Sequence, residues 1–507
     1  FNIKGLYMTL GVNKIHLNNK QDTKILSRLV LDYAHLLNMV KILFNQTYTK
    51  KDYHITNIMI SAKNLRALCC NQKGGKNHQF ITTMREYFKN DPIYIGILNH
   101  YSIKCNEKIA YYVFQEFEKD IKNQYTNKTY SFPKAKKITK INRFSFNLDN
   151  SKFEIKEKEN KLLLKLGKKK DHREIFINYN NLDKNVLRNL DSIKVCYILG
   201  HIEIHFCYKK KEIVNIVPSI PKEKKVSKFA GVDLGLNRTF TLFVNDKDTP
   251  SISFDGHSLI QYNCDFNYKI SKTQRLLSDN AVITTIPNEN GINIPIYSTY
   301  ATHFNKAIKN LNYHRGNYYD DVFHKLSKQI LEYCKINQVT DLVVSSNLSF
   351  AKVKGNIKFK KKTQQKFYQI PFGRLIKYLK LKQYEFGITI HDIDEAYTSK
   401  TSPFVDIKDV LKKVEKNKLN QENKKLSSTV YGGIREGNTF YVNGKGRKCK
   451  MQLHADCVGA YNHCRLVTEC SSPNDIDITK LTTPILIKST EDFTEFLVIS
   501  NVDVEAA

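Results

Sequence analysis

The apolar residues in the first quarter of the chain follow a helical spacing. Across residues 25–115 they recur every three or four positions, as in the series Ile25, Leu26, Leu29, Val30, Tyr33, Leu36, Leu37 and Val40. Residues 8–17, just before this region, alternate between apolar and polar as a strand does. The pattern predicts one strand followed by a set of helices.

The spacing changes to a period of two across residues 144–208. Short alternating segments lie there, near residues 144–148, 153–155, 162–166, 175–177, 193–195 and 202–206. A basic loop at residues 131–137 (Ser-Phe-Pro-Lys-Ala-Lys-Lys) separates them from the helical region. The simplest assembly is a small β-barrel, formed by residues 1–24 and 131–217, that is interrupted by a helical insertion at residues 25–130.

A connector rich in proline and lysine at residues 218–228 marks the main domain boundary. After it, strand-like segments alternate with helix-like ones, the strands near 229–233, 239–244, 252–254, 342–344 and 388–393 and the helices near 267–277, 320–335 and 371–387. This alternation is typical of a sheet covered by helices. The acidic residues 491–507 predict a loosely attached tail, which we begin at residue 471.

Charge indicates the class of partner. The 507 residues include 81 Lys and Arg against 49 Asp and Glu, a formal net charge of +32, which favours a polyanionic partner. A basic membrane-surface protein is the alternative, but here the lysines are spread through every region. No apolar run approaches the ~20 residues of a membrane span, so no membrane partner is expected. The eleven cysteines form no Cys-x-x-Cys pair, which argues against a disulfide scaffold or a zinc ribbon and fits a reducing compartment.

Three acids stand at the ends of buried elements. Asp233 ends a hydrophobic strand, Glu395 follows the segment 388–393, and Asp456 begins a short helix whose glycine and alanine allow close packing. Parallel strands collect ligands beyond their carboxyl ends, so Asp233 and Glu395 are expected to face one cleft. Each acid could instead be a turn residue or a helix cap.

Three carboxylates in one cleft would repel one another unless cations held them. Two Mg²⁺ ions, with Mn²⁺ as an alternative, would satisfy this charge and support hydrolysis of a phosphodiester. The sequence therefore favours a metal-dependent nuclease with Asp233, Glu395 and Asp456 as both the metal ligands and the catalytic residues.

These residues carry a family resemblance. Residues 231–237 (Gly-Val-Asp-Leu-Gly-Leu-Asn) resemble the first motif of the RuvC-type nuclease domain of TnpB, the transposon-encoded RNA-guided endonuclease related to Fanzor proteins and type V CRISPR effectors. Residues 456–462 resemble the third motif. Residues 397–402 (Tyr-Thr-Ser-Lys-Thr-Ser) and 370–374 are also similar to TnpB stretches, and the front half is similar to the wedge and recognition domains of the family.

The resemblance implies an α+β multidomain fold. A β-barrel wedge domain with a helical insertion would precede an RNase H-like (RuvC) α/β nuclease domain at residues 229–402, which is completed by its third motif at residues 451–470. The implied activity is cleavage of target DNA next to a short adjacent motif. The implied partners are a guide RNA and double-stranded DNA, with one protein monomer per guide. The protein would then act in the nucleoid or cytoplasm of a prokaryote, or in the nucleus if it is a Fanzor.

The second motif departs from the family pattern. The family places a glutamate at the end of the fourth strand, where this chain reads Val343-Val344-Ser345-Ser346. Glu395 is the natural substitute, because neighbouring strands lie only ~4.8 Å apart and one branch of the family has such a rearranged site. Tyr397 and Lys400 flank Glu395 and are expected to support it. If the acid is not replaced, the chain is a nuclease-dead, RNA-guided DNA-binding protein that acts as a repressor.

The region between the second and third motifs also departs from the family. Cys449, His454 and Cys457 cluster there without ribbon spacing, so no zinc is expected. Residues 403–450, with the Lys-rich stretch 408–425, are expected to form a lid that contacts the target nucleic acid; a solvated surface helix is the alternative.

Basic segments provide two groups of candidate nucleic-acid contacts. The first group is Lys134, Lys136 and Lys137, and the second is Lys354, Lys360, Lys361 and Lys362. Aromatic residues are interleaved with the second group, a combination suited to binding unpaired strands, although a solvated loop is the plainer interpretation. An unguided transposase or junction resolvase would also use three acids but would not need the long basic front half.

Overall fold

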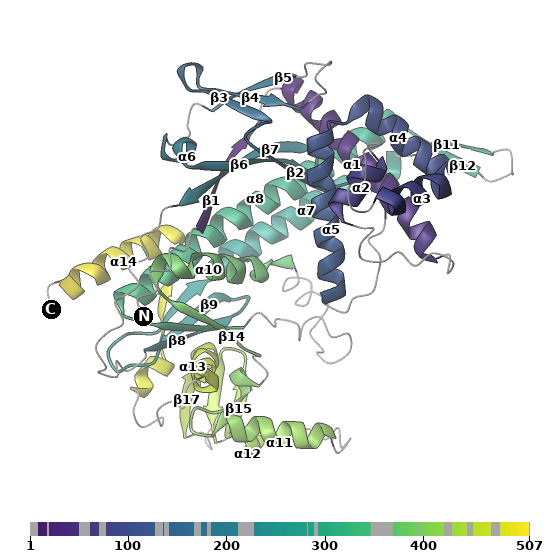
Figure 1. The fold of residues 1–507 in the computed structure, drawn as a ribbon. Coiled ribbons are helices and arrows are strands. Elements are labelled where there is room, and N and C mark those ends of the chain that lie inside the picture. Colours follow the sequence, from purple (N-terminus) through teal and green to yellow (C-terminus); the bar gives the residue numbers. More distant parts are fainter. Residues whose placement is uncertain are drawn as a thin grey trace. The chain divides into compact units, whose positions relative to one another are not determined.

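The computed structural model describes most of the chain: residues 9–17, 20–49, 61–69, 78–126, 135, 141–166, 174–179, 184–210, 228–280, 282–287, 293–345, 369–394, 397–419, 428–443, 450–467 and 477–505. They fall into two compact units (Figure 1). The amino-terminal unit lies within residues 6–212 and 305–313, and the carboxy-terminal unit within residues 1–5, 213–304 and 314–507.

Helices dominate the first part of the amino-terminal unit, as the spacing predicts. They are α1 (Lys20–Thr49), α2 (Ala62–Cys69), α3 (His78–Phe88), α4 (Pro92–Lys104) and α5 (Glu107–Thr126). The start of α4 shows why the chain becomes helical there: Asp91 accepts a hydrogen bond from the Ile93 N–H at 2.7 Å, and Pro92 has no N–H that would need an acceptor.

Strands of the same unit form two antiparallel sheets. One has the order β1-β7-β6-β2 and the other β3-β4-β5. Their bounds are β1 (Thr9–His16), β2 (Arg143–Leu148), β3 (Phe153–Lys156), β4 (Lys161–Lys165), β5 (Glu174–Asn178), β6 (Leu190–Ile198) and β7 (His201–Lys210), with the short helix α6 (Lys184–Arg188). Both sheets contribute to the buried core that they share with the helices. Each alternating segment is therefore a strand, as predicted.

A six-stranded sheet is the centre of the carboxy-terminal unit. Its order is β14-β13-β8-β9-β10-β18. The strands are β8 (Phe229–Leu234), β9 (Arg238–Val244), β10 (Ile252–Asp255), β13 (Asp341–Val344), β14 (Thr389–Asp392) and β18 (Ile485–Ile487). β8, β13 and β14 are parallel neighbours, with Val343 opposite Gly231, whereas β9 is antiparallel to β8 and to β10. The five predicted strands are confirmed, and β18 is an addition.

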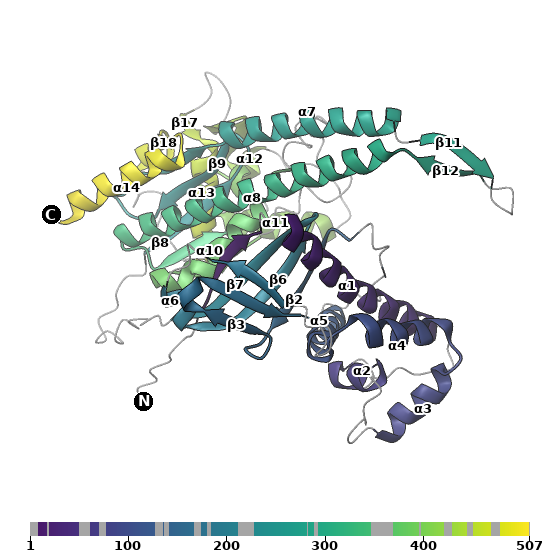
Figure 2. The same ribbon diagram turned by 90° about the horizontal axis from the view of Figure 1, so that it is seen from above.

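This unit has long helices, of which the first two extend beyond the predicted segments 267–277 and 320–335, whereas the third matches 371–387 closely. They are α7 (His257–Asn280), α8 (Thr299–Ile336), α10 (Phe372–Phe386), α13 (Ala455–Val467) and α14 (Thr490–Glu505). Figure 2 shows a hairpin of β11 (Val282–Pro287) and β12 (Asn293–Tyr297), not predicted, that connects α7 to α8. Gly387, at a φ of +66°, ends α10 as the sequence suggests. Among the described residues, no helix has both the length and the hydropathy that crossing a membrane requires.

The prediction of a loose carboxy-terminal tail is wrong. Residues 490–505 form α14, and Phe493 and Leu497, one turn apart, are buried in the core of the sheet. The Ser489 hydroxyl accepts from the Asp492 N–H at 3.0 Å and so caps the helix. The acidic residues Glu491, Asp492 and Glu495 of this helix are exposed.

The region between β14 and α13 has its own small sheet. It contains the short helix η5 (Thr398–Lys400), α11 (Ile407–Leu419), α12 (Ser428–Tyr431) and the antiparallel strands β15 (Gly433–Glu436), β16 (Thr439–Val442) and β17 (Met451–His454). The sequence analysis predicts none of these strands. In α11, Ile407, Val410 and Val414 are buried, so one face of this helix packs and is not simply solvated.

Candidate active site

Asp233 lies near the carboxyl end of the buried strand β8. Ala230, Val232 and Leu234 point into the core of the sheet, and the alternation of a strand puts Gly231 and Asp233 on the other face. Helix α13 packs on that face, because a Cβ atom on Gly231 would lie only 1.9 Å from the Ala460 carbonyl oxygen. The glycine thus allows α13 to approach the strand backbone.

The same helix brings the two aspartates together. A Cβ atom on Gly459 would lie 2.4 Å from Asp233 Oδ2, so the carboxylate rests directly on the helix. Asp456 precedes Gly459 by three residues and shares its helix face, where neighbouring Cβ atoms are ~5–6 Å apart. Burial, then the charges of Asp456 and Asp233, raise the pKa of the Cys457 thiol, which agrees with both carboxylates lying nearby.

Arg435 holds Asp456 from the small sheet. Its Nη2 donates to Asp456 Oδ1 at 2.8 Å, and its Nε donates to the Gly437 carbonyl at 3.2 Å. The carboxylate is 13% exposed and the arginine 30%, so the ion pair is only partly screened by solvent. Sequence reasoning missed Arg435. The available signal is the Gly437-Asn438 turn, which is typical of a hairpin and would have placed Arg435 on its first strand.

Asn462 and His463 fix the turn after β14 to α13. Asn462 Nδ2 donates to the carbonyl oxygens of Thr398 and Thr401 at 2.8 and 2.7 Å. Burial lowers the pKa of His463 to about 4, so its ring is neutral, and Nδ1–H donates to the Val232 carbonyl at 2.9 Å. The motif Tyr-Thr-Ser-Lys-Thr-Ser, β8 and the helix that carries Asp456 therefore form one connected structure.

Two residues that matter for the predicted triad, Glu395 and Ser346, lie outside the described residues. Their described neighbours limit the alternatives. Ser345 follows β13 beside Asp233 and is buried, and its hydroxyl makes no hydrogen bond to any described group. The first residue after β13 is thus a serine and not a carboxylate, and Glu395 as the third acid stays a prediction.

Tyr397 and Lys400 lie in the turn that follows Glu395. Tyr397 has a φ of +68°, its ring stacks on that of Tyr431, and Lys400 Nζ lies 5.9 Å from the Tyr397 ring centre. The predicted nucleic-acid contacts Lys134, Lys136, Lys137, Lys354, Lys360, Lys361 and Lys362 all lie outside the described residues.

The described residues of the site could supply two of the carboxylate ligands of a divalent cation. Mg²⁺ commonly uses one or two carboxylates and completes its shell with water and substrate phosphate, so the Asp233–Asp456 pair is a suitable donor set. Within the described ranges, no group of three or more His, Cys, Asp or Glu side chains could hold a metal ion. Burial lowers the pKa of the His454 imidazole and outweighs the charge of the nearby Asp456, which raises that pKa. Arg238 and Arg435 lower the same pKa further.

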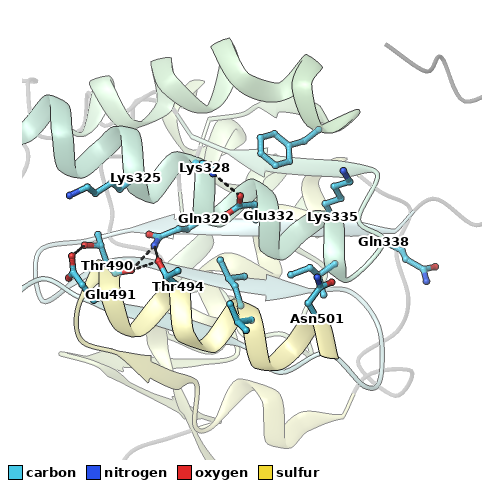
Figure 3. A pocket seen from close by; sticks show the side chains of 14 residues that line it. Lys325, Lys328, Gln329, Glu332, Lys335, Gln338, Thr490, Glu491, Thr494 and Asn501 are labelled. Carbon is cyan, nitrogen blue, oxygen red and sulfur yellow. Dashed lines mark hydrogen bonds and ion pairs between the residues drawn. The ribbon is translucent and has the colours of Figure 1, made fainter. Parts of the chain in front are cut away.

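A separate pocket of about 920 Å³ lies between α8 and α14 (Figure 3). Lys325, Lys328 and Lys335 line it, together with apolar residues of α14. Gln338 also lines it, only three residues before β13 begins, so the pocket is at the amino end of that strand. The aspartate pair is at the carboxyl end of the parallel strands, and the pocket is not part of it.

Two family models match consecutive stretches of the chain. The first, OrfB_IS605, described as "Probable transposase", matches residues 205–350, which include Asp233. The second, described as "Cas12f1-like, TNB domain", matches residues 372–463, which include Asp456 and Arg435. These two stretches are TnpB-like. The resemblance drawn from the sequence motifs is confirmed by these matches.

Solved structures similar to this chain are remote in sequence. A Cas12f1–sgRNA–target DNA complex shares 14% identity at a TM-score of 0.44, covering 90% of this chain and 98% of that one. A CRISPR–Cas12f ternary complex shares 13% identity at a TM-score of 0.29, covering 89% of this chain and 98% of that one. An AacC2c1–sgRNA binary complex shares 10% identity at a TM-score of 0.32, covering 89% of this chain and 71% of that one. No curated protein matches the sequence.

Proposed function

We propose that the chain is an RNA-guided DNA endonuclease. The observation that carries the proposal is the pair of aspartates at the carboxyl end of β8: Asp233 rests on α13 one turn from Asp456, and a TnpB-type family model covers Asp233. In this proposal residues 229–402 and 451–470 form an RNase H-like (RuvC) nuclease domain. Residues 403–450 contact the target nucleic acid.

Asp233, Asp456 and Glu395 would hold two Mg²⁺ ions, and Mn²⁺ could replace them. When bound, such ions would activate a water molecule and stabilise the leaving oxygen of the phosphodiester. The chain provides the rest: Arg435 orients Asp456, and Asn462 fixes the turn after Glu395 to the helix that carries Asp456. Asp233 is positioned by β8 and by the close approach of Gly459.

The proposed partners are a guide RNA and double-stranded target DNA, with one monomer per guide. A net charge of +32 suits both polyanions, and the similar Cas12f1 structure is itself a complex with sgRNA and target DNA. The amino-terminal unit would read a short motif beside the target, and base pairing would supply the remaining specificity. The protein would act where its target DNA lies, in the nucleoid or the nucleus.

Sequencing of the RNA that co-purifies with the protein is the first test. A single discrete RNA is expected, whereas random fragments would contradict guidance. The protein loaded with this RNA should then cut a matching plasmid in Mg²⁺. Asp233→Asn and Asp456→Asn should reduce cleavage by about 10³-fold or more, because each removes a metal ligand. Asp492→Asn, at an exposed acid on α14, is the matched control and should cut normally.

Ser346, at the place where the family has its glutamate, favours a second candidate, a nuclease-dead protein that binds DNA under RNA guidance. Guided binding by the unaltered protein without any nick would establish this alternative. Cleavage that survives Glu395→Ala would instead retain the nuclease and reject Glu395 as the third acid.

A further inference from the structure

Two tyrosine rings stack on each other in the region between β14 and α13. The rings of Tyr397 and Tyr431 are parallel to within 10°, with centroids 6.0 Å apart, as in an offset-stacked pair. Both residues are half-buried, so part of their surface remains open to solvent. Lys400, which is exposed, places its ammonium 5.9 Å from the Tyr397 ring centre.

The backbone holds both rings in fixed positions. Tyr397 has a φ of +68°, an unfavourable region for a residue with a side chain, and its carbonyl accepts from the Lys400 N–H at 3.1 Å and the Thr401 hydroxyl at 2.9 Å. The Tyr431 carbonyl accepts from the Ser402 N–H at 2.8 Å. The pair is therefore organised before any ligand arrives.

The same turn is attached to the helix that carries Asp456. Asn462 of α13 binds the carbonyls of Thr398 and Thr401, on either side of Lys400. The aromatic pair thus belongs to the connected structure that includes both aspartates. Phe404, 41% exposed and two residues past the turn, extends the apolar surface.

We infer that Tyr397, Tyr431 and Lys400 form a stacking platform for an unpaired nucleobase of the strand presented to the aspartates. An aromatic face with an adjacent cation is how proteins bind single strands without reading their sequence, because every base has a π-face and is followed by a phosphate. The inference rests on the proposed nuclease function and adds where the substrate strand is held.

A spectroscopic test is available because the chain contains no tryptophan. Tyr397→Trp introduces a unique indole, whose fluorescence should be quenched when a single-stranded (dT) oligonucleotide is added to the full-length protein without metal. Binding elsewhere on the basic surface would not quench it. In the matched pair Tyr397→Phe and Tyr397→Leu, the phenylalanine variant should bind within about twofold of the unaltered protein, and the leucine variant about tenfold more weakly.

Equal affinity of the leucine and phenylalanine variants, or an indole that the oligonucleotide leaves unquenched, would overturn the platform. Tyr431→Phe and Tyr431→Leu repeat the comparison at the last residue of the short helix α12, where φ is not positive, which guards against a folding defect caused by the backbone of residue 397. Cleavage by the unaltered protein together with no quenching would reject the platform alone. Quenching together with no cleavage would reject the proposed nuclease alone.

Discussion

The carboxylates near the two ends of strand β8 have opposite electrostatic surroundings. At the amino end, Asp246 accepts from Lys480 Nζ at 3.0 Å and from the Thr249 N–H at 2.8 Å, and it also pairs with Lys228. At the carboxyl end, two aspartates lie one helix turn apart, and Arg435 pairs with Asp456. The first end has two cations for one acid, whereas the second gathers acids.

This difference separates a stabilising cluster from the cluster that we propose to be catalytic. Burial alone would raise the pKa of Asp246, but hydrogen bonds from Lys228, Thr249 and Lys480 outweigh it and lower the pKa to about 2. Lys480 belongs to the carboxy-terminal segment, so this cluster fixes that segment to the sheet. At the other end, adjacent carboxylates are a liability for folding unless a cation or substrate uses them.

Lys480→Met should have the largest effect of the substitutions considered, a loss of folding stability. It removes a buried cation from Asp246, and the free energy of unfolding should fall by about 3 kcal/mol. Because the folded pKa of Asp246 lies below its unfolded value, its stabilisation of about 2 kcal/mol is present above pH ~4 and is lost as the pH falls toward 2. The variant should show less of this acid dependence.

Urea unfolding between pH 2 and 7 measures both effects. Lys488→Met, at an exposed lysine eight residues further along, is the matched control and should change stability by less than about 0.5 kcal/mol. Equal stability of the two variants would mean that the Asp246 cluster does not hold the segment.

Gly459→Ala should act at the proposed catalytic end and spare stability. The added Cβ would lie 2.4 Å from Asp233 Oδ2, and the carboxylate can rotate away, so the fold survives while the aspartate pair is disturbed. Cleavage should fall about 10²-fold. Gly373→Ala, where nothing lies within 4 Å of the new atom, gains the same helix propensity and should cut normally. Full cleavage by the Gly459 variant would contradict the placement of Asp233.

Arg435→Gln should have the smallest effect on stability, less than about 1 kcal/mol, because the ion pair is partly exposed. Removing the positive charge beside Asp456 should instead tighten Mn²⁺ binding about fivefold, measured by electron paramagnetic resonance without nucleic acid. Arg275→Gln, at an arginine 85% exposed on α7, should leave Mn²⁺ binding unchanged. Weaker Mn²⁺ binding in the Arg435 variant would mean that the orientation of Asp456 by the arginine matters more for the ion than the positive charge that the arginine adds.

The sequence predicts the elements that carry Asp233 and Asp456 because each signal is local. A hydrophobic run that ends in Gly-Val-Asp defines β8, and a Gly-Ala pair after Asp456 marks a helix that packs closely, as Gly459 and Ala460 do. The link between them is not local. Contacts such as Asn462 with Thr398 join residues 64 positions apart, and only the folded chain shows them.

The missed elements had weaker or misleading signals. The negative charge of residues 491–507 led to the prediction of a loose tail. Phe493 and Leu497, four residues apart, instead fit a buried helix face. Strand β18 has only three residues and is defined by its pairing with β10. Arg435 lies on a hairpin that follows the lysine-rich stretch 408–425, and its contact with Asp456 joins residues 21 positions apart.

Asn462 makes the site sensitive to a change that conserves shape. Its amide donates to two carbonyl oxygens at once, and its own oxygen accepts from Arg465 Nη1 at 3.1 Å. Aspartate has nearly the same volume, yet its carboxylate has no donor and would face two acceptors in a buried setting. A single-nucleotide transition is enough to exchange these two amino acids. A single point mutation at Asn462 would therefore abolish the proposed nuclease activity without changing any of its acids.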